Sequence, residues 1–355
     1  VPNYSHWPCD GYYITAQKTN PPIGAMNVWK LHERYPDLAF LGEVYPKLVK
    51  WHDWFKVGRA RKGQMLLSWG NNHGNAWHAN LESGWDDTPA FEGAVLEDDL
   101  LNVYCVDLSS LWAADAEYLE KMALALGKKE DATRFRKEHA DMVREINEKL
   151  WNPELGIYCN SYWADAEDGT PRFQTRITPM NFYPLICGAP DAKRAKKVLR
   201  WAHDPKKFWG EYPMPTLSYD DPDWHKQTYW KGHIWGPVSY LVWQGLLRYD
   251  DAEHLSQYAD RSVRLFMNGW NLPIQACAEN YNSTDGSVGD DPHYTWGALL
   301  PLLGLEYLVD VDDNLEPVAR KVDFKGNLSL YRIPFGGRLY DISCKDGKVT
   351  VRRSE

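Results

Sequence analysis

The stretch from Glu97 to Gly127, EDDLLNVYCVDLSSLWAADAEYLEKMALALG, decides the fold class. Apolar side chains recur in it at intervals of three and four residues, which is the spacing that lines one face of an α-helix. Gly127 ends the pattern, and glycine is frequent just beyond the last turn of a helix. A second periodic run, EDATRFRKEHADMVREINEKLW, begins at Glu130. The two runs predict two long antiparallel helices joined by a short turn.

The same periodicity extends along most of the chain. The run NPPIGAMNVWKLHERY opens with proline, which is favoured at a helix start, and residues 38–58 repeat the apolar spacing around Pro46. Further helices are expected at residues 178–188, 191–204, 234–249, 251–268 and 292–310. Strand-like alternation is expected only in the tail, at residues 326–334, 337–344 and 347–353. The sequence therefore predicts an all-α domain of about nine helices over residues 1–315, followed by a short antiparallel β-tail over residues 316–355.

Composition excludes several classes of protein. The chain has 355 residues, of which 44% are hydrophobic and 25% charged, as in an ordinary soluble domain. It has no apolar run long enough to cross a bilayer. A net charge of −9 without a block of Lys or Arg argues against nucleic acid or membrane as a partner. The sequence favours neither a cytoplasmic nor a secreted location.

Metal and cofactor motifs are not apparent. The six cysteines lie far apart without a C-x-x-C pair, which favours free thiols. His73 and His78 have no convincing third ligand. A phosphate-binding glycine loop and a G-x-S-x-G nucleophile motif are not found. We therefore predict no cofactor and no metal site.

Tryptophan and tyrosine are unusually frequent. There are 18 Trp and 21 Tyr but only 10 Phe. Both residues combine a flat apolar face with a polar group, which suits the apolar faces and hydroxyl rims of sugars. Filling of wide gaps between helices is the more common role, and we expect it for most of the 18 tryptophans.

Three long loops combine acids, aromatic residues and glycines. They are ESGWDDTP at residues 82–89, FWGEYPMPTLSYDDPDWHKQTYWKGHIWGP at 208–237 and AENYNSTDGSVGDDPHYTW at 278–296. Cleavage of a glycosidic bond needs two carboxyl groups, one protonated to donate to the leaving oxygen and one ionised to activate water or attack carbon. Loops that converge at the mouth of a helical toroid would supply them, and adjacent aromatic rings would raise the pKa of the acid.

These residues also resemble a known family. ESGWDDTP, QTYWKGHIWGPVSYLVWQGLLRY and ENYNSTDGSVGDDPHYTW look like the signature blocks of glycoside hydrolase family 63 and related mannosylglycerate-hydrolase-type enzymes, a group that includes processing α-glucosidase I. NPPIGAMNVWK and MNFYPLICGA add to a likeness that covers most of residues 17–310. The resemblance implies an (α/α)6 toroid and hydrolysis with inversion. Because that toroid has twelve helices and about nine are predicted here, we expect either that an N-terminal segment or a partner chain completes it, or that the fold is a trimmed variant.

The resemblance assigns the two catalytic carboxylates. Asp86 falls on the family's general acid and Glu279 on its general base, and an inverting pair would lie roughly 6.5–9.5 Å apart. The residues alone leave other interpretations open. Asp86 and Asp87 could cap a helix after Pro89, and Glu279 could be a surface acid.

Further residues in the three loops are predicted to bind substrate: Glu82, Trp85, Asp87, Gln227, Tyr229, Trp230, Lys231, Trp235, Tyr281, His293 and Trp296. Glu82 could instead pair with a cation, and His293 could be a core histidine. At least one of Tyr229, Trp230 and Trp235 is expected in the core. Lys231 stands where the family often has arginine, and the two residues are not equivalent at a bidentate contact.

The sequence thus predicts an inverting α-glycoside hydrolase that acts on an oligosaccharide or a small glycoside. A trehalase-like α-glucosidase would keep both carboxylates and change only the sugar subsites. A non-catalytic carbohydrate-binding protein would need the aromatic residues but not two separated acids. A helical scaffold with all its tryptophans in the core would bind no sugar.

Overall fold

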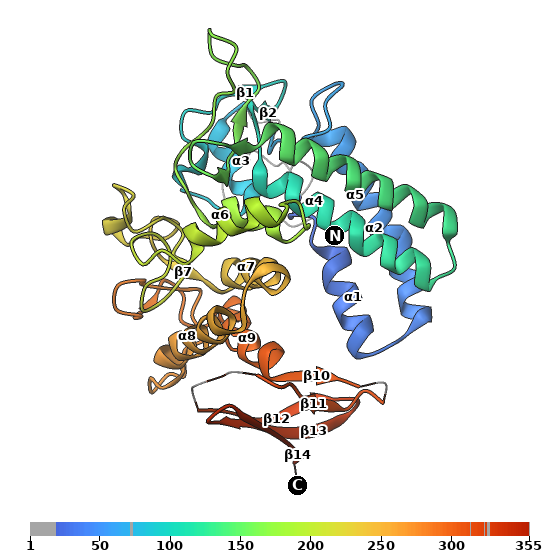
Figure 1. Cartoon of the computed structure of the whole chain (residues 1–355), viewed down its shortest axis with the longest axis vertical. Helices are drawn as coiled ribbons and strands as arrows, with labels where there is room; N and C mark the ends of the chain where they lie inside the picture. Colours follow the sequence, from blue (N-terminus) through green and yellow to red (C-terminus); the bar gives the residue numbers. More distant parts are fainter. Residues whose placement is uncertain (1–18, 72–73, 313, 323, 325–326, 355) are drawn as a thin grey trace, which may run out of the picture. The chain divides into compact units, whose positions relative to one another are not determined.

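A computed structural model describes residues 19–71, 74–312, 314–322, 324 and 327–354, and the chain divides into two compact units. The first unit comprises the described residues as far as Asn27 and then Phe40–Ala189. The second unit comprises Val28–Ala39 and the chain from Pro190 onward. In Figure 1 most of the first unit is blue to green and most of the second is yellow-green to red. The predicted boundary near residue 316 falls inside the second unit.

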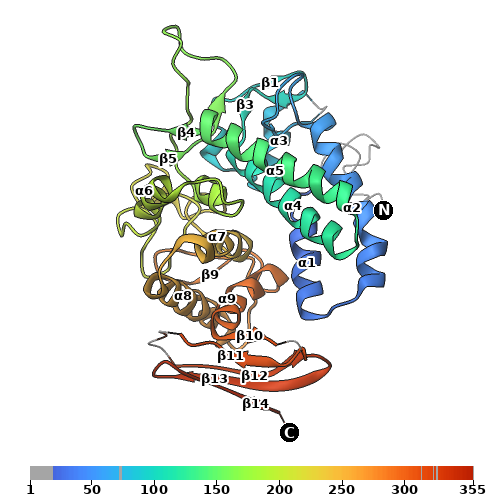
Figure 2. The ribbon, with the colours of Figure 1, turned by 45° about the vertical axis from the view of Figure 1, so that its right-hand side comes forward.

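The first unit is built on the predicted helical pair. Helices α4 (Val106–Ala125) and α5 (Lys129–Lys149) run antiparallel and pack along their length (Figures 1 and 2). Gly127 makes the turn between them with a φ of +72°, a left-handed conformation that suits glycine. Most of α4 is buried, whereas α5 buries one face. Helix α2 (Leu38–Gly58) contains Pro46 and joins this pair through side-chain contacts to both helices.

The prediction of an all-α domain over residues 1–315 is wrong in one respect, because short strands replace part of the expected helical structure. The helix expected from Glu97 begins only at Val106, and β1 (Leu96–Glu97), β2 (Leu100–Leu101) and β3 (Val103–Tyr104) precede it. Asp98 and Asp99 have φ values of +51° and +65°, which no right-handed helix accommodates. The other short elements of this unit are α3 (Ala76–Ser83), β4 (Trp151–Asn152), β5 (Ile157–Tyr158), β6 (Ser161–Tyr162) and the 3-10 helices η2 (Pro89–Phe91) and η3 (Pro179–Leu185).

The second unit contains α6 (Ala192–Ala202), α7 (Gly236–Tyr249), α8 (Ala252–Trp270) and α9 (Leu299–Leu308), and receives most of α1 (Gly24–Arg34). Helix α9 packs against both α7 and α8 (Figure 2). Its sequence, LLPLLGLEYL, is apolar almost all round, as expected of a helix with neighbours on several sides. The helices expected at residues 191–204, 234–249 and 251–268 are therefore present, while the one expected from residue 292 begins at Leu299.

The tail forms the predicted antiparallel strands. Strands β12 (Leu328–Phe335), β13 (Arg338–Lys345) and β14 (Lys348–Arg353) make one sheet in chain order, and β10 (Val309–Val311) pairs with β11 (Pro317–Ala319). Alternate residues of β13, namely Tyr340, Ile342 and Cys344, are buried, as the period of two predicts. Among the described residues, no helix combines the length and apolar character needed to span a bilayer.

Candidate active site

Asp86 and Asp87 lie half-buried in a turn between two short helices of the first unit. The preceding helix α3 ends at Gly84, whose φ of +78° turns the chain out of the helix. The following helix η2 is capped by Thr88, whose hydroxyl accepts a hydrogen bond from the amide of Ala90 at 3.3 Å. Thr88, and neither Asp86 nor Asp87, is therefore the N-cap of η2, so the capping role considered for the two aspartates is filled by another residue.

The Asp86 turn is anchored to the start of α4. The Asn160 side chain donates to the carbonyl of Ala90 at 3.1 Å and accepts from the amide of Val106 at 2.8 Å. Trp85 is only 4% exposed, so the ring beside Asp86 is part of the packed interior. The turn that holds both aspartates therefore has a fixed backbone on each side.

Glu82 pairs with a cation, which was one of its two predicted roles. Its carboxylate is bonded by both Nε and Nη2 of Arg59, the first at 2.6 Å. It also accepts from the amides of Thr19 at 2.9 Å and Gly70 at 3.1 Å. The carboxylate is fully buried. These contacts favour a structural role, in which Glu82 ties α3 to the end of α2.

Asp107 is a buried carboxyl that the sequence did not single out. It is 1% exposed in the first turn of α4, and its Oδ2 accepts from the indole of Trp69 at 3.0 Å. Oδ1 has no hydrogen-bond partner among the described residues. Burial raises the pKa of Asp107 to about 6, against the lowering effect of the Trp69 hydrogen bond. An aspartate at the start of a helix is usually an ordinary first-turn acid, so the sequence carried no signal for this group.

Glu279 belongs to the second unit and precedes a small sheet that joins the two other loops. In this sheet β7 (Ile234–Trp235) pairs with β8 (Asn280–Tyr281), and β8 pairs with β9 (Val288–Gly289). Glu279 is half-buried, and its amide donates to the carbonyl of Asp291 at 2.8 Å. The predicted loops at 208–237 and 278–296 are thus held together by backbone pairing.

A polar network on the same sheet fixes the residue next to Glu279. Asn280 is fully buried, its Oδ1 lies 2.6 Å from Nδ1 of His233, and its Nδ2 donates to Asp290 at 2.7 Å. Gly289 packs so closely that a Cβ there would lie 2.3 Å from Oδ1 of Asn280. His233, Asn280 and Asp290 were not predicted, because nothing in the sequence indicates that they meet.

The predicted aromatic platforms divide into buried and accessible rings. Trp230 and Trp235 stack on each other at 3.9 Å and are 4% and 0% exposed, so both belong mainly to the core. Tyr229 is half-buried against the edge of this pair, with its ring 5.0 Å from that of Trp235. Trp296 is 39% exposed and lies 6.0 Å from Trp235. Of these four predicted residues, Tyr229 and Trp296 are the less buried.

The remaining predicted residues of the second unit differ in burial and in hydrogen bonding. Gln227 donates to the carbonyl of Trp224 and accepts from Ser283, so its amide already joins the two loops. Tyr281 is fully buried, and burial raises its pKa to about 12. Lys231 is half-buried in the turn that precedes β7. His293 is exposed, which excludes the core position that was its alternative.

One group of side chains in the second unit could bind a metal ion. Of the residues that the structure describes, His203, Asp250 and His254 have ligand atoms within 4.8 Å of one another, and none of the three is a predicted site residue. His73 lies outside the described residues.

Comparison with known proteins identifies the family. A family model described as the mannosylglycerate hydrolase MGH1-like glycoside hydrolase domain matches residues 3–297. The chain belongs to this family. The match includes the loops of Asp86 and Glu279, and it confirms the resemblance to glycoside hydrolase family 63 drawn from the sequence.

Relatives of this MGH1-like domain carry glycosidase names. The mannosylglycerate hydrolase MGH1 of Selaginella moellendorffii is 27% identical over 312 residues, which cover 71% of this chain and 59% of the relative's length. The mannosylglycerate hydrolase of family 63 from Thermus thermophilus shares the fold, with a TM-score of 0.69, 19% identity and coverage of 85% and 82%. The neutral trehalase of Saccharomyces cerevisiae does so as well, with a TM-score of 0.65, 16% identity and coverage of 82% and 62%.

Proposed function

We propose that the protein is an inverting α-glycoside hydrolase with Asp86 as general acid and Glu279 as general base. Membership of the MGH1-like glycoside hydrolase domain family is the observation that carries this proposal, because the matched residues include both carboxylates. The two local structures support it. Asp86 follows the buried Trp85 in the chain, and Glu279 precedes the sheet whose strand β7 carries Trp235.

The proposed reaction needs two proton transfers and no cofactor. Protonated Asp86 donates its proton to the glycosidic oxygen as the bond from that oxygen to the anomeric carbon breaks. Ionised Glu279 takes a proton from the water that attacks the anomeric carbon from the opposite face. The product is the free sugar with inverted configuration, and Asp86 and Glu279 then exchange the surplus proton with solvent.

We also infer that the helices belong to an (α/α)6 toroid, a proposal supported by the fold shared with the family 63 hydrolase. The predicted division into a catalytic domain over residues 1–315 and a β-tail over 316–355 remains a proposal. It is supported by the family match, which stops at residue 297.

The substrate is proposed to be a small α-linked glycoside. The names of the relatives point to mannosylglycerate or trehalose, which differ both in the sugar whose anomeric carbon reacts and in the leaving group. Tyr229, which is half-buried, and Trp296, which is 39% exposed, are proposed to stack on sugar rings. Asp87, Gln227, Lys231 and His293 remain proposed contacts. Trp85, Trp230, Trp235 and Tyr281 are buried, and we propose that each supports the neighbouring substrate-binding residues of its own unit. Glu82 is proposed not to contact the substrate, because its carboxylate is bound by Arg59.

The test is proton NMR of an α-glycoside panel that includes mannosylglycerate and trehalose. Wild type is expected to release the inverted anomer first, and Asp86→Asn and Glu279→Gln are each expected to lose about 10³-fold or more in kcat. The thermal midpoint and the affinity for the best sugar show whether each variant is folded and still binds. Turnover that survives both substitutions would overturn the residue assignment, and binding without turnover by wild type would support a carbohydrate-binding protein instead.

A further inference from the structure

A group of imidazoles and carboxylates in the second unit has no part in the proposed reaction. It lies where three helix ends meet, and we refer to it as the helix-end cluster: His203, Asp250, Asp251 and His254. His203 is the C-cap of α6, Asp250 is the C-cap of α7, and Asp251 is the N-cap of α8. His254 follows in the first turn of α8.

The Asp250 carboxylate is buried without a permanent cation. Its side chain is 2% exposed, Oδ2 lies 2.8 Å from Nε2 of His203, and Oδ1 accepts from the amide of Asp251 at 2.9 Å. Nδ1 of His254 is 3.8 Å away. No Lys or Arg forms an ion pair with Asp250 among the residues that the structure describes. Burying a carboxylate is costly unless a charge compensates it, and an imidazole supplies a full charge only when it is protonated.

The donor atoms have separations near those of a metal coordination shell. Ligands of tetrahedral Zn²⁺, bound at about 2.0–2.1 Å, lie about 3.4 Å apart. Oδ2 of Asp250 lies 2.8 Å from Nε2 of His203, and Oδ1 of Asp250 lies 3.8 Å from Nδ1 of His254, so the one carboxylate is near both imidazoles. Asp251 offers a further oxygen 2.9 Å from Nδ1 of His254. The C-terminal ends of α6 and α7 favour a cation, whereas the N-terminus of α8 disfavours one, so the carboxylates rather than the helix dipoles must supply the attraction.

Binding requires one ring to move. The imidazoles of His203 and His254 are stacked 3.5 Å apart at an interplanar angle of 4°, whereas an ion lies in the plane of every imidazole that binds it. Trp209 meets both rings edge-on, but the His203 side chain is only 15% exposed and its Nε2 is held 2.8 Å from the buried Asp250 carboxylate. His254 is 31% exposed and can rotate about χ2, a torsion with broad preferences.

We propose that His203, Asp250 and His254, with Asp251 as a fourth donor, bind one divalent transition-metal ion of the Zn²⁺ type. Imidazole and carboxylate together suit this class of ion. The ion would join the end of α6 to the junction of α7 and α8. This departs from the prediction of no metal site, because the cluster is assembled from segments 47 residues apart in the sequence. It does not depend on the proposed hydrolase activity.

The test is a Co²⁺ titration of the full chain, free of any affinity tag and treated with a chelator beforehand. Visible d–d absorption is expected to saturate at one equivalent and to disappear when Zn²⁺ is added in competition. Excess Zn²⁺ is expected to raise the thermal midpoint by several degrees, because only the folded state assembles the ligands. A wild type that binds less than half an equivalent, or that shows no saturation, would overturn the proposal.

Variants show whether these residues hold the ion. His254→Gln and Asp250→Asn are each expected to weaken Co²⁺ binding by at least about tenfold and to reduce the stabilisation by Zn²⁺. His225→Gln, which removes an exposed histidine elsewhere in the second unit, is the matched control and is expected to bind as wild type does. His254→Gln decides the outcome because its partly exposed side chain is replaced by one of similar size. Unchanged affinity in that variant would place the ion elsewhere and refute the site.

Discussion

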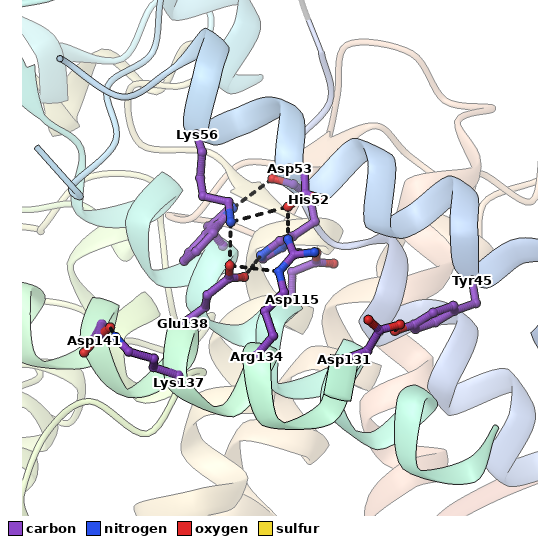
Figure 3. A network of polar contacts seen from close by, with 11 residues as sticks. Tyr45, His52, Asp53, Lys56, Asp115, Asp131, Arg134, Lys137, Glu138 and Asp141 are labelled. Atoms are coloured by element: carbon purple, nitrogen blue, oxygen red, sulfur yellow. Dashed lines mark hydrogen bonds and ion pairs between the residues drawn. The ribbon is translucent and has the colours of Figure 1, made fainter. Parts of the chain in front are cut away.

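At the residue scale, a buried histidine on α2 connects three helices of the first unit. His52 is 1% exposed, with Nδ1 2.8 Å from Asp115 on α4 and Nε2 3.2 Å from Glu138 on α5. Figure 3 shows Lys56 and Arg134 converging on the same Glu138 carboxylate. The imidazole therefore lies between two acids, one of which is shared with two further cations.

This arrangement predicts a pH-dependent stability. Burial alone would lower the pKa of His52, but hydrogen bonds to Asp115 and Glu138 outweigh it and raise the pKa above 6.5. A raised folded-state pKa means that the stabilisation is complete below the unfolded pKa and is lost as pH rises through the folded value. We expect His52→Gln to lower the free energy of unfolding by about 3–5 kcal/mol near pH 5.5, since it leaves two carboxylates without the cation between them. Urea unfolding at pH 5.5 and pH 9 measures this loss and its decrease with pH.

The control for this prediction is another histidine of the first unit. His139→Gln removes a partly buried ring whose Nε2 contacts the carbonyl of Cys187 at 2.9 Å, with no acid involved. Its effect on the unfolding free energy should change less between the two pH values. A His52→Gln deficit that grew toward pH 9 would contradict the charge argument.

The surroundings of some single residues could be predicted from the sequence, and those of others could not. The loop of Asp86 could be predicted because its glycine, tryptophan and acids form one short motif. The partner of Glu82 could not, because Arg59 lies 23 residues away and their contact depends on how α2 and α3 fold back. The raised pKa of Asp107 could not be predicted either, because it comes from burial and not from a residue nearby in the sequence.

At the element scale, the β7–β8–β9 sheet sets the position of Glu279. Gly289 on β9 has no room for a side chain, since a Cβ would lie 2.3 Å from Oδ1 of Asn280. We expect Gly289→Ala to push Asn280 and the adjoining Glu279 out of place. The expected loss is about 1–3 kcal/mol in the free energy of unfolding and about 10–100-fold in kcat. Urea unfolding and steady-state kinetics on the best α-glycoside measure the two effects.

Gly42 on α2 is the matched control, because a Cβ there meets only Leu126 at an ordinary 3.8 Å. Gly42→Ala should keep full activity and gain about 0.5–1 kcal/mol, as alanine is the better helix former. Full activity in Gly289→Ala would show that the sheet does not position the base.

The length of an element decides whether it could be predicted from the sequence. Helices α4 and α5 repeat their apolar spacing over five turns or more, so packing reinforces a strong local signal. Strands β7, β8 and β9 have two residues each, too few for any alternation to be recognised. These strands form because they pair with one another in the folded chain, and such pairing between distant segments cannot be recognised from a local stretch of sequence.

At the scale of the whole molecule, an early segment of the chain belongs to the second unit. Residues 28–39 join the chain from Pro190 onward, although the residues on both sides of them belong to the first unit. Lys30 bonds Glu306 of α9 at 3.2 Å, and Tyr240, Trp243 and Gln244 of α7 donate to the same carboxylate. Burial would raise the pKa of Glu306, but Lys30 and these hydrogen bonds lower it.

We expect Lys30→Met to lower the free energy of unfolding by about 2–3 kcal/mol, somewhat less than the loss of a fully buried ion pair. The reason is that Glu306 keeps its hydrogen bonds but loses its cation. Adding Glu306→Gln should recover part of the loss, so a double-mutant cycle in urea measures the coupling. Lys47→Met, which breaks an exposed pair with Glu43 on α2, should cost below about 0.5 kcal/mol. Strictly additive effects of Lys30→Met and Glu306→Gln would contradict the pairing.

The order of synthesis makes the Lys30–Glu306 contact a late event in folding. The two residues are 276 positions apart, and at about 5–20 residues per second the ribosome delivers the second roughly 15–55 s after the first. During that interval the rest of the first unit emerges, while Lys30 lacks the Glu306 carboxylate and the α7 side chains that bond it. The second unit is therefore completed only when α9 contacts a segment that was synthesised long before it.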